Sequence, residues 1–324
     1  MNKKLVFIFI VCISLILTNS CQEPYIKFNP ISEVTEIIVP EELIPEESLD
    51  DPQETGIPCT ESSGENLVLA EVLPPIEIPL DLPENHDLSD NIPPVRSQGQ
   101  QGSCTAWATT YYLKSYQEKI QNGYQYDSYE HVMSPAFVYN QIKSNPHCNS
   151  GSNIEDALRL LKEQGTATWK NFPYSDDACN NIPSDEIKEI ATINKIKDYY
   201  TIQTIDSITD QNHTLTNIIK ALIYKKQPVI ISMKFKNLNF KYKTSDSIYI
   251  ANSYVETVKK ECGHAILITG YDDEINAFKI VNSWGTSWGN KGYAWVSYNF
   301  FLPNEHIDFQ EGLTGKYVAF DEED

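Results

Sequence analysis

The order of helix and strand signals along the chain limits the folds that it can adopt. Upstream of Pro228, helical spacing and helix-boundary residues predict helices at residues 103–121, 134–143, 153–162 and 187–197. Downstream of Pro228, apolar runs rich in β-branched residues predict strands at residues 229–233, 265–271, 277–281 and 293–297. Helices that come first and strands that come later predict an α+β fold with two unlike halves.

The first twenty residues have the pattern of an export signal. Lys3 and Lys4 precede an apolar run, residues 5–17, that is too short for a comfortable membrane span. Cys21 follows Ser20 directly after this run, as in a bacterial lipoprotein, so we expect residues 1–20 to be removed and Cys21 to be lipidated. The lipid would anchor the protein to a membrane of the cell envelope. Ordinary cleavage near Ser20 is the alternative, and either route exports the protein and permits disulfides.

Charge is concentrated in the segment that follows the signal. The net charge is -20, and residues 22–90 hold 18 Asp and Glu against one Lys. A segment rich in acids and prolines buries too little apolar surface to offset its chain entropy. We therefore expect a largely disordered tether at residues 21–79 and a folded domain at residues 80–324, with an inhibitory propeptide as the alternative to the tether. The rest of the chain is nearly neutral, which argues against a nucleic-acid partner.

A glycine-bearing loop leads into a cysteine at the predicted start of the first helix. Residues 97–108 read S-Q-G-Q-Q-G-S-C-T-A-W-A, and the helix dipole would stabilise the thiolate of Cys104. A nucleophilic thiol needs a base, and His264 opens the strand-like run G-H-A-I-L-I-T-G-Y. Asn282 follows in V-N-S-W-G, where adjacent antiparallel strands would let its amide orient the imidazole and let Trp284 cover both. A packed core histidine and an Asn-Ser turn are the alternatives for either motif taken alone.

Together these three segments resemble the papain-like cysteine peptidases, from about residue 82 to the end of the chain. The resemblance implies a two-lobed α+β fold, with a helical lobe whose central helix begins at the nucleophile and a β-barrel-like lobe. It implies that Cys104 is the nucleophile, that His264 is the general base and acid, and that Asn282 orients the imidazole. It also implies that Gln98 and the Cys104 N–H form the oxyanion hole.

The same resemblance implies a substrate-binding region. The sequence C-N-S-G at residues 148–151 parallels the family's Cys-Asn-Gly-Gly segment, whose last glycine pairs with an extended substrate. The residues that the resemblance places around the substrate are Ser150, Gly151, Ser152, Asn153, Ile154, Cys262, Ala265 and Trp284. Of these, Ser152, Asn153, Ile154, Cys262 and Ala265 are expected around the pocket that binds the second residue before the cleaved bond. Their mixed character suggests that this pocket prefers a moderately apolar side chain.

Departures from the family pattern carry further predictions. Gln101 stands where the family usually has a cysteine that bridges to the position of Cys148, and Cys179 lacks its usual partner. We therefore predict a disulfide between Cys148 and Cys179, whose loop of about 30 residues would stabilise the domain by roughly 3 to 4 kcal/mol. In the family, the residue after the nucleophile is usually aromatic and packs near the oxyanion hole. In this chain that residue is Thr105.

The distance along the chain from Cys104 to His264, 160 residues, also exceeds the usual range and indicates an insertion within residues 234–258.

The predicted activity is hydrolysis of peptide bonds in a protein or peptide, through an acyl-enzyme, by a monomer that needs no metal or other cofactor. No paired ligand motif such as CxxC or HExxH occurs, which argues against a zinc site. Two alternatives remain. A cell-wall peptide amidase is disfavoured by Gln98 and the Asn-Ser-Trp-Gly element, and an inactive binding module is disfavoured by the four matching catalytic positions.

Overall fold

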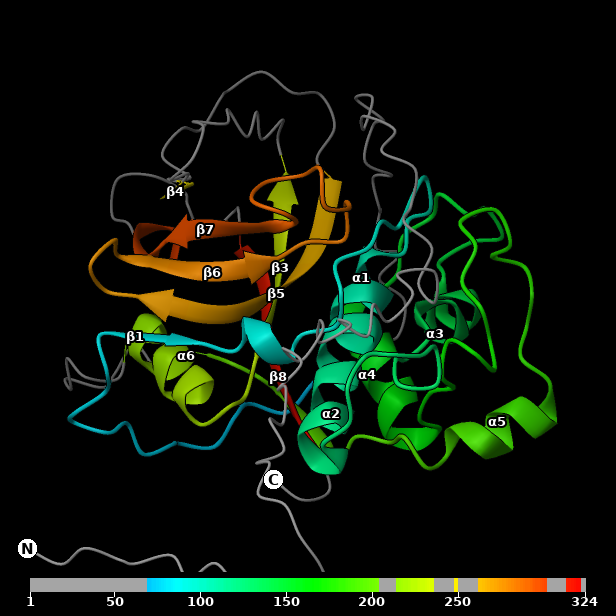
Figure 1. The fold of residues 1–324 in the computed structure, drawn as a ribbon, viewed down its shortest axis with the longest axis horizontal. Helices are drawn as coiled ribbons and strands as arrows, with labels where there is room; N and C mark the ends of the chain where they lie inside the picture. The colour runs from blue at the N-terminus through cyan, green and yellow to red at the C-terminus, as the bar shows by residue number, and fades with distance from the viewer. Residues whose placement is uncertain (1–68, 204–213, 236–247, 250–261, 302–312, 322–324) are drawn as a thin grey trace, which may run out of the picture. The chain divides into compact units, whose positions relative to one another are not determined.

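Helices from the first half of the chain and strands from the second half lie side by side as two lobes (Figure 1). The computed structural model describes residues 69–203, 214–235, 248–249, 262–301 and 313–321, all within one compact unit. This arrangement confirms the predicted α+β fold. Among the described residues, no helix has both the length and the apolar character that a membrane crossing requires.

One continuous helix runs through the helical lobe. It consists of α1 (Cys104–Ala106), the π-helical stretch η3 (Trp107–Lys114) and α2 (Ser115–Asn122), and it ends at Gly123 with a positive φ of 69°. This confirms the helix predicted at residues 103–121 and its glycine cap. The π-helical stretch is rich in threonine and aromatic residues, which lose side-chain freedom in a regular α-helix.

Three further helices complete this lobe: α3 (Pro135–Ile142), α4 (Ile154–Glu163) and α5 (Asp185–Ala191). Side-chain caps explain where α3 and α4 begin: Ser134 Oγ accepts the Phe137 N–H at 3.2 Å, and Asn153 Oδ1 accepts the Glu155 N–H at 2.8 Å. Both starts agree with the sequence prediction.

The predicted helix at residues 187–197 was wrong at both ends. Ser184 caps α5 from its side chain, so the helix begins at Asp185, two residues before the predicted start. It ends at Ala191 because the next residues turn inward, where Asn194 Nδ2 donates to the carbonyl of Thr166 at 2.8 Å.

The second lobe is an eight-stranded sheet with the order β2-β8-β3-β5-β6-β7-β4, and β1 pairs with β5 outside this path. Its strands are β1 (Asn85–Asp87), β2 (Asp198–Thr201), β3 (Val229–Phe235), β4 (Ile248–Tyr249), β5 (Cys262–Asp272), β6 (Ala277–Val281), β7 (Tyr293–Ser297) and β8 (Leu313–Phe320). All pairs are antiparallel except β4 with β7. The four predicted strands correspond to β3, β5, β6 and β7.

Three short helices accompany the sheet: η2 (Ser89–Asn91), η4 (Tyr298–Phe301) and α6 (Leu215–Tyr224). Helix α6 was not predicted from the sequence, although its start is marked by Thr214, whose Oγ1 accepts the Asn217 N–H at 3.2 Å. In Figure 1, α6 lies beside β1.

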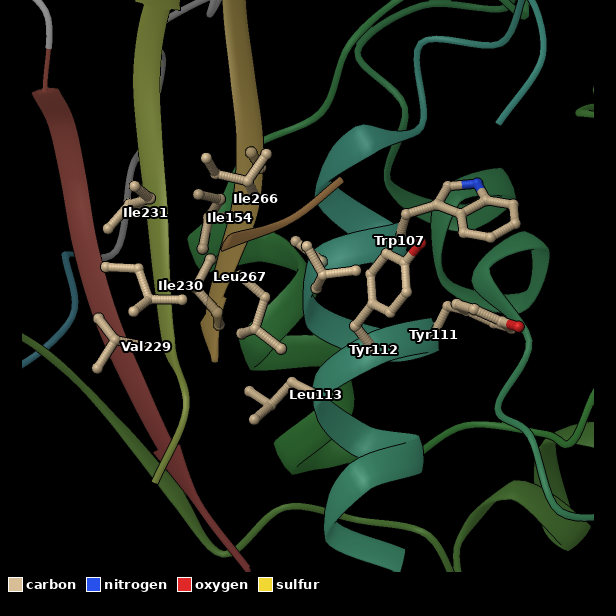
Figure 2. Close-up of a cluster of buried hydrophobic side chains, with 14 of the residues drawn as sticks. Trp107, Tyr111, Tyr112, Leu113, Ile154, Val229, Ile230, Ile231, Ile266 and Leu267 are labelled. Carbon is tan, nitrogen blue, oxygen red and sulfur yellow. The ribbon is translucent and has the colours of Figure 1, made fainter. Parts of the chain in front are cut away.

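Buried side chains from both lobes form one core. Leu113 of the central helix points toward Ile230 of β3 and Leu267 of β5, whereas Trp107 and Tyr111 point away from the sheet (Figure 2). Both faces of the central helix are therefore buried, one against the sheet and the other within the helical lobe.

The described part of the chain makes contacts upstream of the predicted domain boundary at residue 80. Val72 pairs with Thr201 at the free edge of β2, where Leu73 N–H donates to the Thr201 carbonyl at 2.9 Å. Leu73 and Ile76 also pack against the core. Residues 72–76 were predicted to belong to the tether because of the composition of that segment. Their apolar side chains and the edge of β2 instead attach them to the folded domain.

Several predictions lie outside the described residues. They are the signal segment, Cys21, the tether up to residue 68, and most of the insertion predicted within residues 234–258. Cys262 lies in β5, but its side chain is not described.

Candidate active site

Cys104 is the first residue of α1 and follows the loop at residues 97–103. It is a free thiol, and its side chain is buried with 7% of its surface exposed. The loop is tied to the other lobe, because the Gln98 N–H donates to the Ser283 carbonyl at 2.8 Å and Ser97 forms a bridge with Trp284. The helix that carries the thiol therefore begins at the junction of the two lobes.

His264 and Asn282 come together from β5 and the end of β6. His264 Nε2 lies 2.8 Å from Asn282 Oδ1, and both residues are buried. Asn282 Oδ1 also accepts the Ser283 N–H at 2.8 Å, which identifies this atom as the oxygen of the amide. Since oxygen only accepts, His264 Nε2 carries a hydrogen, and in the neutral imidazole Nδ1 is then the basic nitrogen.

Trp284 covers the imidazole. Its ring stacks on His264 with the centroids 4.6 Å apart and an interplanar angle of 29°, and Trp288 meets Trp284 edge-on at 5.6 Å. This aromatic cover keeps water from the His264–Asn282 hydrogen bond, as the Asn-Ser-Trp-Gly motif predicts.

The thiol of Cys104 lies beside the residue that follows His264. The main-chain N–H groups of Ala265 and Thr105 and the Thr105 hydroxyl stabilise the Cys104 thiolate, but burial outweighs them and raises the pKa of the thiol. Burial also lowers the pKa of His264 to about 4, and the bond to Asn282 opposes this shift. Burial thus favours the neutral thiol and the neutral imidazole.

Gln98 is held on both sides of its amide. Its Oε1 accepts the hydroxyl of Ser283 at 2.6 Å, and its Nε2 donates to the Gln101 carbonyl at 2.7 Å. An amide nitrogen has two hydrogens, so one remains for another acceptor. Gln98 was predicted for this site from the sequence, whereas the bond from Ser283 was not, although Ser283 belongs to the same motif as Asn282.

Two tyrosines that the sequence analysis did not assign also hold the site. The Tyr112 hydroxyl donates to the Asn282 carbonyl at 2.8 Å, and the Tyr174 hydroxyl donates to the Gln98 carbonyl at 2.7 Å. Tyr174 also accepts the hydroxyl of Ser103 at 2.8 Å. The sequence F-P-Y that ends at Tyr174 is the signal that could have revealed it, whereas the position of Tyr112 depends on the packing of the two lobes.

The segment at residues 150–153 lies against the loop that precedes Cys104. Gly102 N–H donates to the Cys148 carbonyl at 2.8 Å, and a Cβ on Gly102 would lie 2.3 Å from the Ser150 carbonyl oxygen. The Ser150 hydroxyl donates within its own turn, to the His147 carbonyl. The Gly151 carbonyl accepts the Ser144 N–H at 2.9 Å.

The other residues expected around the substrate have different surroundings. Ala265 adjoins Cys104, as described above. Ile154 belongs to the buried core between the lobes (Figure 2).

Cys148 and Cys179 form a disulfide, with their Cα atoms 5.4 Å apart. This is the pairing predicted for the two cysteines without family partners. The segments that it joins both contact the loop that precedes Cys104: the Cys148 carbonyl binds Gly102, and Asp176 Oδ2 accepts the Gln100 N–H at 2.9 Å. Among the residues that the structure describes, no three His, Cys, Asp or Glu side chains are grouped to bind a metal.

Residues 82–306 match the family described as "Papain family cysteine protease". The chain belongs to this family. Cysteine proteinase 3 of Entamoeba histolytica is 26% identical over 215 residues, which cover 65% of this chain and 61% of that protein. Mouse cathepsin K is 26% identical over 213 residues, which cover 64% of this chain and 57% of cathepsin K. The chain thus spans about three fifths of the length of these two relatives.

Solved structures agree with the papain-family assignment. Xylellain, a cysteine protease from Xylella fastidiosa, has a TM-score of 0.60 and 25% identity, with 78% of this chain and 91% of that chain covered. Procathepsin L 3 from the larval midgut of Tenebrio molitor has a TM-score of 0.54 and 16% identity, with 78% and 75% covered, and shows the shared fold alone.

One departure from the papain-family pattern is explained by the structure. Gln101, which replaces the usual cysteine, is buried, and its Nε2 donates to the carbonyls of Ser175 and Asp176 at 3.2 and 3.3 Å. Side-chain hydrogen bonds thus connect this loop to residues 175–176, close to Cys179, in place of a covalent bridge at position 101.

Proposed function

We propose that this protein is a cysteine peptidase that hydrolyses peptide bonds with Cys104 as nucleophile, His264 as general base and acid, and Asn282 as the residue that orients the imidazole. The observation that carries the proposal is the 2.8 Å bond between His264 Nε2 and Asn282 Oδ1, together with the free thiol of Cys104, which lies at a helix start and beside the Ala265 N–H. That bond directs the basic Nδ1 of His264 away from Asn282, and the N–H of the next residue, Ala265, stabilises the Cys104 sulfur.

Acylation begins when the thiol proton moves to His264 Nδ1 and the sulfur forms a bond to the scissile carbonyl carbon. The carbonyl electrons move to oxygen, which accepts hydrogen bonds from the free Nε2 hydrogen of Gln98 and from the Cys104 N–H. The C–N bond then breaks, and the imidazolium protonates the leaving amine. His264 next removes a proton from water, which attacks the thioester carbon, and the acid product leaves as the thiol is restored.

A mechanism-based thiol reagent tests this proposal. A peptidyl epoxide should form one adduct on Cys104, detected by peptide mass spectrometry, and the mature protein should cleave members of a peptide library. Cys104→Ala should abolish both the adduct and the cleavage. Equal cleavage by the two proteins would refute the proposal, and labelling of Cys104 without cleavage of any peptide would favour the amidase alternative.

We also propose that the protein is exported and anchored by a lipid on Cys21. The support is the basic and apolar pattern of residues 1–17 followed by a small residue and a cysteine. Metabolic labelling with an alkyne fatty acid should mark the full chain in a bacterial host and should fail for Cys21→Ala. Equal labelling of both chains would contradict the anchor.

A further inference from the structure

The residue next to the nucleophile makes a hydrogen bond toward the region expected to bind substrate. Thr105 is the second residue of α1, and its side chain is buried. Its Oγ1 donates to the main-chain carbonyl of Ser152 at 3.0 Å, across 47 positions in the sequence. The residue that carries this hydroxyl is thus covalently joined to Cys104 and hydrogen-bonded to the segment at residues 150–153.

The three successive carbonyls of this segment have protein donors from three different places. The Ser150 carbonyl accepts the Tyr139 hydroxyl at 2.5 Å, and the Gly151 carbonyl accepts the Ser144 N–H at 2.9 Å. These two donors belong to α3 and to the turn before the segment. The Thr105 hydroxyl is the donor that belongs to the nucleophile's own helix.

The position of Thr105 is itself well determined. Its carbonyl accepts the hydroxyl of Thr109, one turn later, at 2.8 Å. A directed hydrogen bond from the Thr105 hydroxyl therefore connects the start of the helix to the segment at residues 150–153.

We propose that Thr105 is a positioning residue. Its hydroxyl holds residues 150–153 at a set distance from Cys104, so that an extended substrate bound along this segment has its scissile carbonyl at the Cys104 sulfur. This inference rests on the proposed peptidase function. It predicts that loss of the Thr105 hydroxyl raises KM more for substrates that reach residues 150–153 than for substrates that occupy only the vicinity of the thiol.

Steady-state kinetics of the mature protein with two reporter substrates tests the inference. One substrate is a blocked tripeptidyl amide, and the other is a blocked single-residue ester. Thr105→Val keeps the shape of the side chain and removes the donor, so KM for the tripeptidyl substrate should rise by about tenfold, the usual effect of one buried hydrogen bond. Because the Thr105 hydroxyl also stabilises the Cys104 thiolate, kcat should fall by the same factor for both substrates, whereas KM for the ester should change by less than about twofold. Thr105→Ser restores the hydroxyl and should return KM to the wild-type value.

Thr166→Val is the matched control. It removes another buried threonine hydroxyl of the helical lobe, which donates to the Ala167 carbonyl at 3.3 Å and not to Thr105 or to residues 150–153. It should leave the ratio of KM for the two substrates unchanged. If Thr105→Val and Thr166→Val shift both substrates alike, or if Thr105→Ser behaves as Thr105→Val does, the inference is wrong and the hydroxyl is merely structural.

Two further measurements keep the outcomes separate. Alkylation of Cys104 by iodoacetamide measures separately how the loss of the Thr105 hydroxyl affects the thiolate, because this small reagent does not reach residues 150–153. The same factor should appear in kcat for both substrates. Should Thr105→Val fail to fold, Thr105→Ala provides the same comparison of the two substrates. Activity that survives in Cys104→Ala would refute the peptidase proposal itself, a result that no Thr105 variant can produce.

Discussion

Asn282 binds His264 through its side chain and the central helix through its main chain. Its Oδ1 lies 2.8 Å from His264 Nε2, and its carbonyl accepts the Tyr112 hydroxyl at 2.8 Å. The asparagine therefore connects the imidazole of the sheet lobe to the helix that begins with Cys104. The relative placement of His264 and Cys104 depends on this double attachment.

Removing the Asn282 amide should impair catalysis more than binding. In Asn282→Ala the buried His264 Nε2–H would lose its acceptor, which costs about 1 to 3 kcal/mol and corresponds to a loss of roughly 5- to 150-fold in kcat/KM. The loss should fall mainly on kcat in steady-state assays. Ser297→Ala, another buried polar residue of the sheet lobe, is a control that should retain activity. Wild-type kinetics in Asn282→Ala would contradict the orienting role.

Gln98 should stabilise the transition state without affecting the thiol. Gln98→Ala should lower kcat by roughly 10²- to 10³-fold, the effect of losing one oxyanion donor. The rate of Cys104 alkylation by iodoacetamide should stay the same, because this reaction forms no oxyanion. Gln100→Ala, an exposed residue of the same loop, should behave as wild type. An equal loss in both variants would instead indicate a general disturbance of the loop.

The disulfide should contribute to the stability of the helical lobe. Replacing Cys148 and Cys179 with serine opens a loop of 31 residues and should lower the free energy of unfolding by roughly 3 kcal/mol. Urea unfolding at pH 7 in a Cys104→Ala background measures this difference without interference from the free thiol. An unchanged urea midpoint and slope would show that the bridge adds no stability.

Protonation of the buried His264 should reduce stability in acid. Burial lowers the pKa of His264 from 6.5 to about 4, so the unfolded chain binds more protons between these values. Stability from this group is therefore complete above pH 6.5 and is lost as the pH falls toward 4, by roughly 3 kcal/mol in total.

Unfolding of Cys104→Ala at pH 7 and pH 4.5, compared with Cys104→Ala/His264→Gln, isolates this contribution from that of the carboxylates. The double variant should lose less stability on acidification. Equal losses in the two proteins would show that the imidazole titrates normally in the folded state.

Local signals in the chain identified most of the elements. Ser134 and Asn153 marked the starts of α3 and α4, and Gly123 marked the end of the central helix, because caps act on neighbouring main-chain groups. Boundaries that depend on distant partners were missed. Helix α5 ends just before the turn in which Asn194 donates to the Thr166 carbonyl. Val72 pairs with Thr201 at the edge strand β2.

The sequence by itself determined the chemistry of the candidate site, since the loop before Cys104 and the motifs around His264 and Asn282 specify which functional groups are present. Only the tertiary structure decided how those groups are held. Ser283, Tyr112, Tyr174 and Thr105 act through hydrogen bonds to residues 47 to 185 positions away, apart from the bond of Ser283 to its neighbour Asn282. Contacts of that range leave no periodic or spacing signal in a single chain, because they arise only when segments that are distant in sequence pack together.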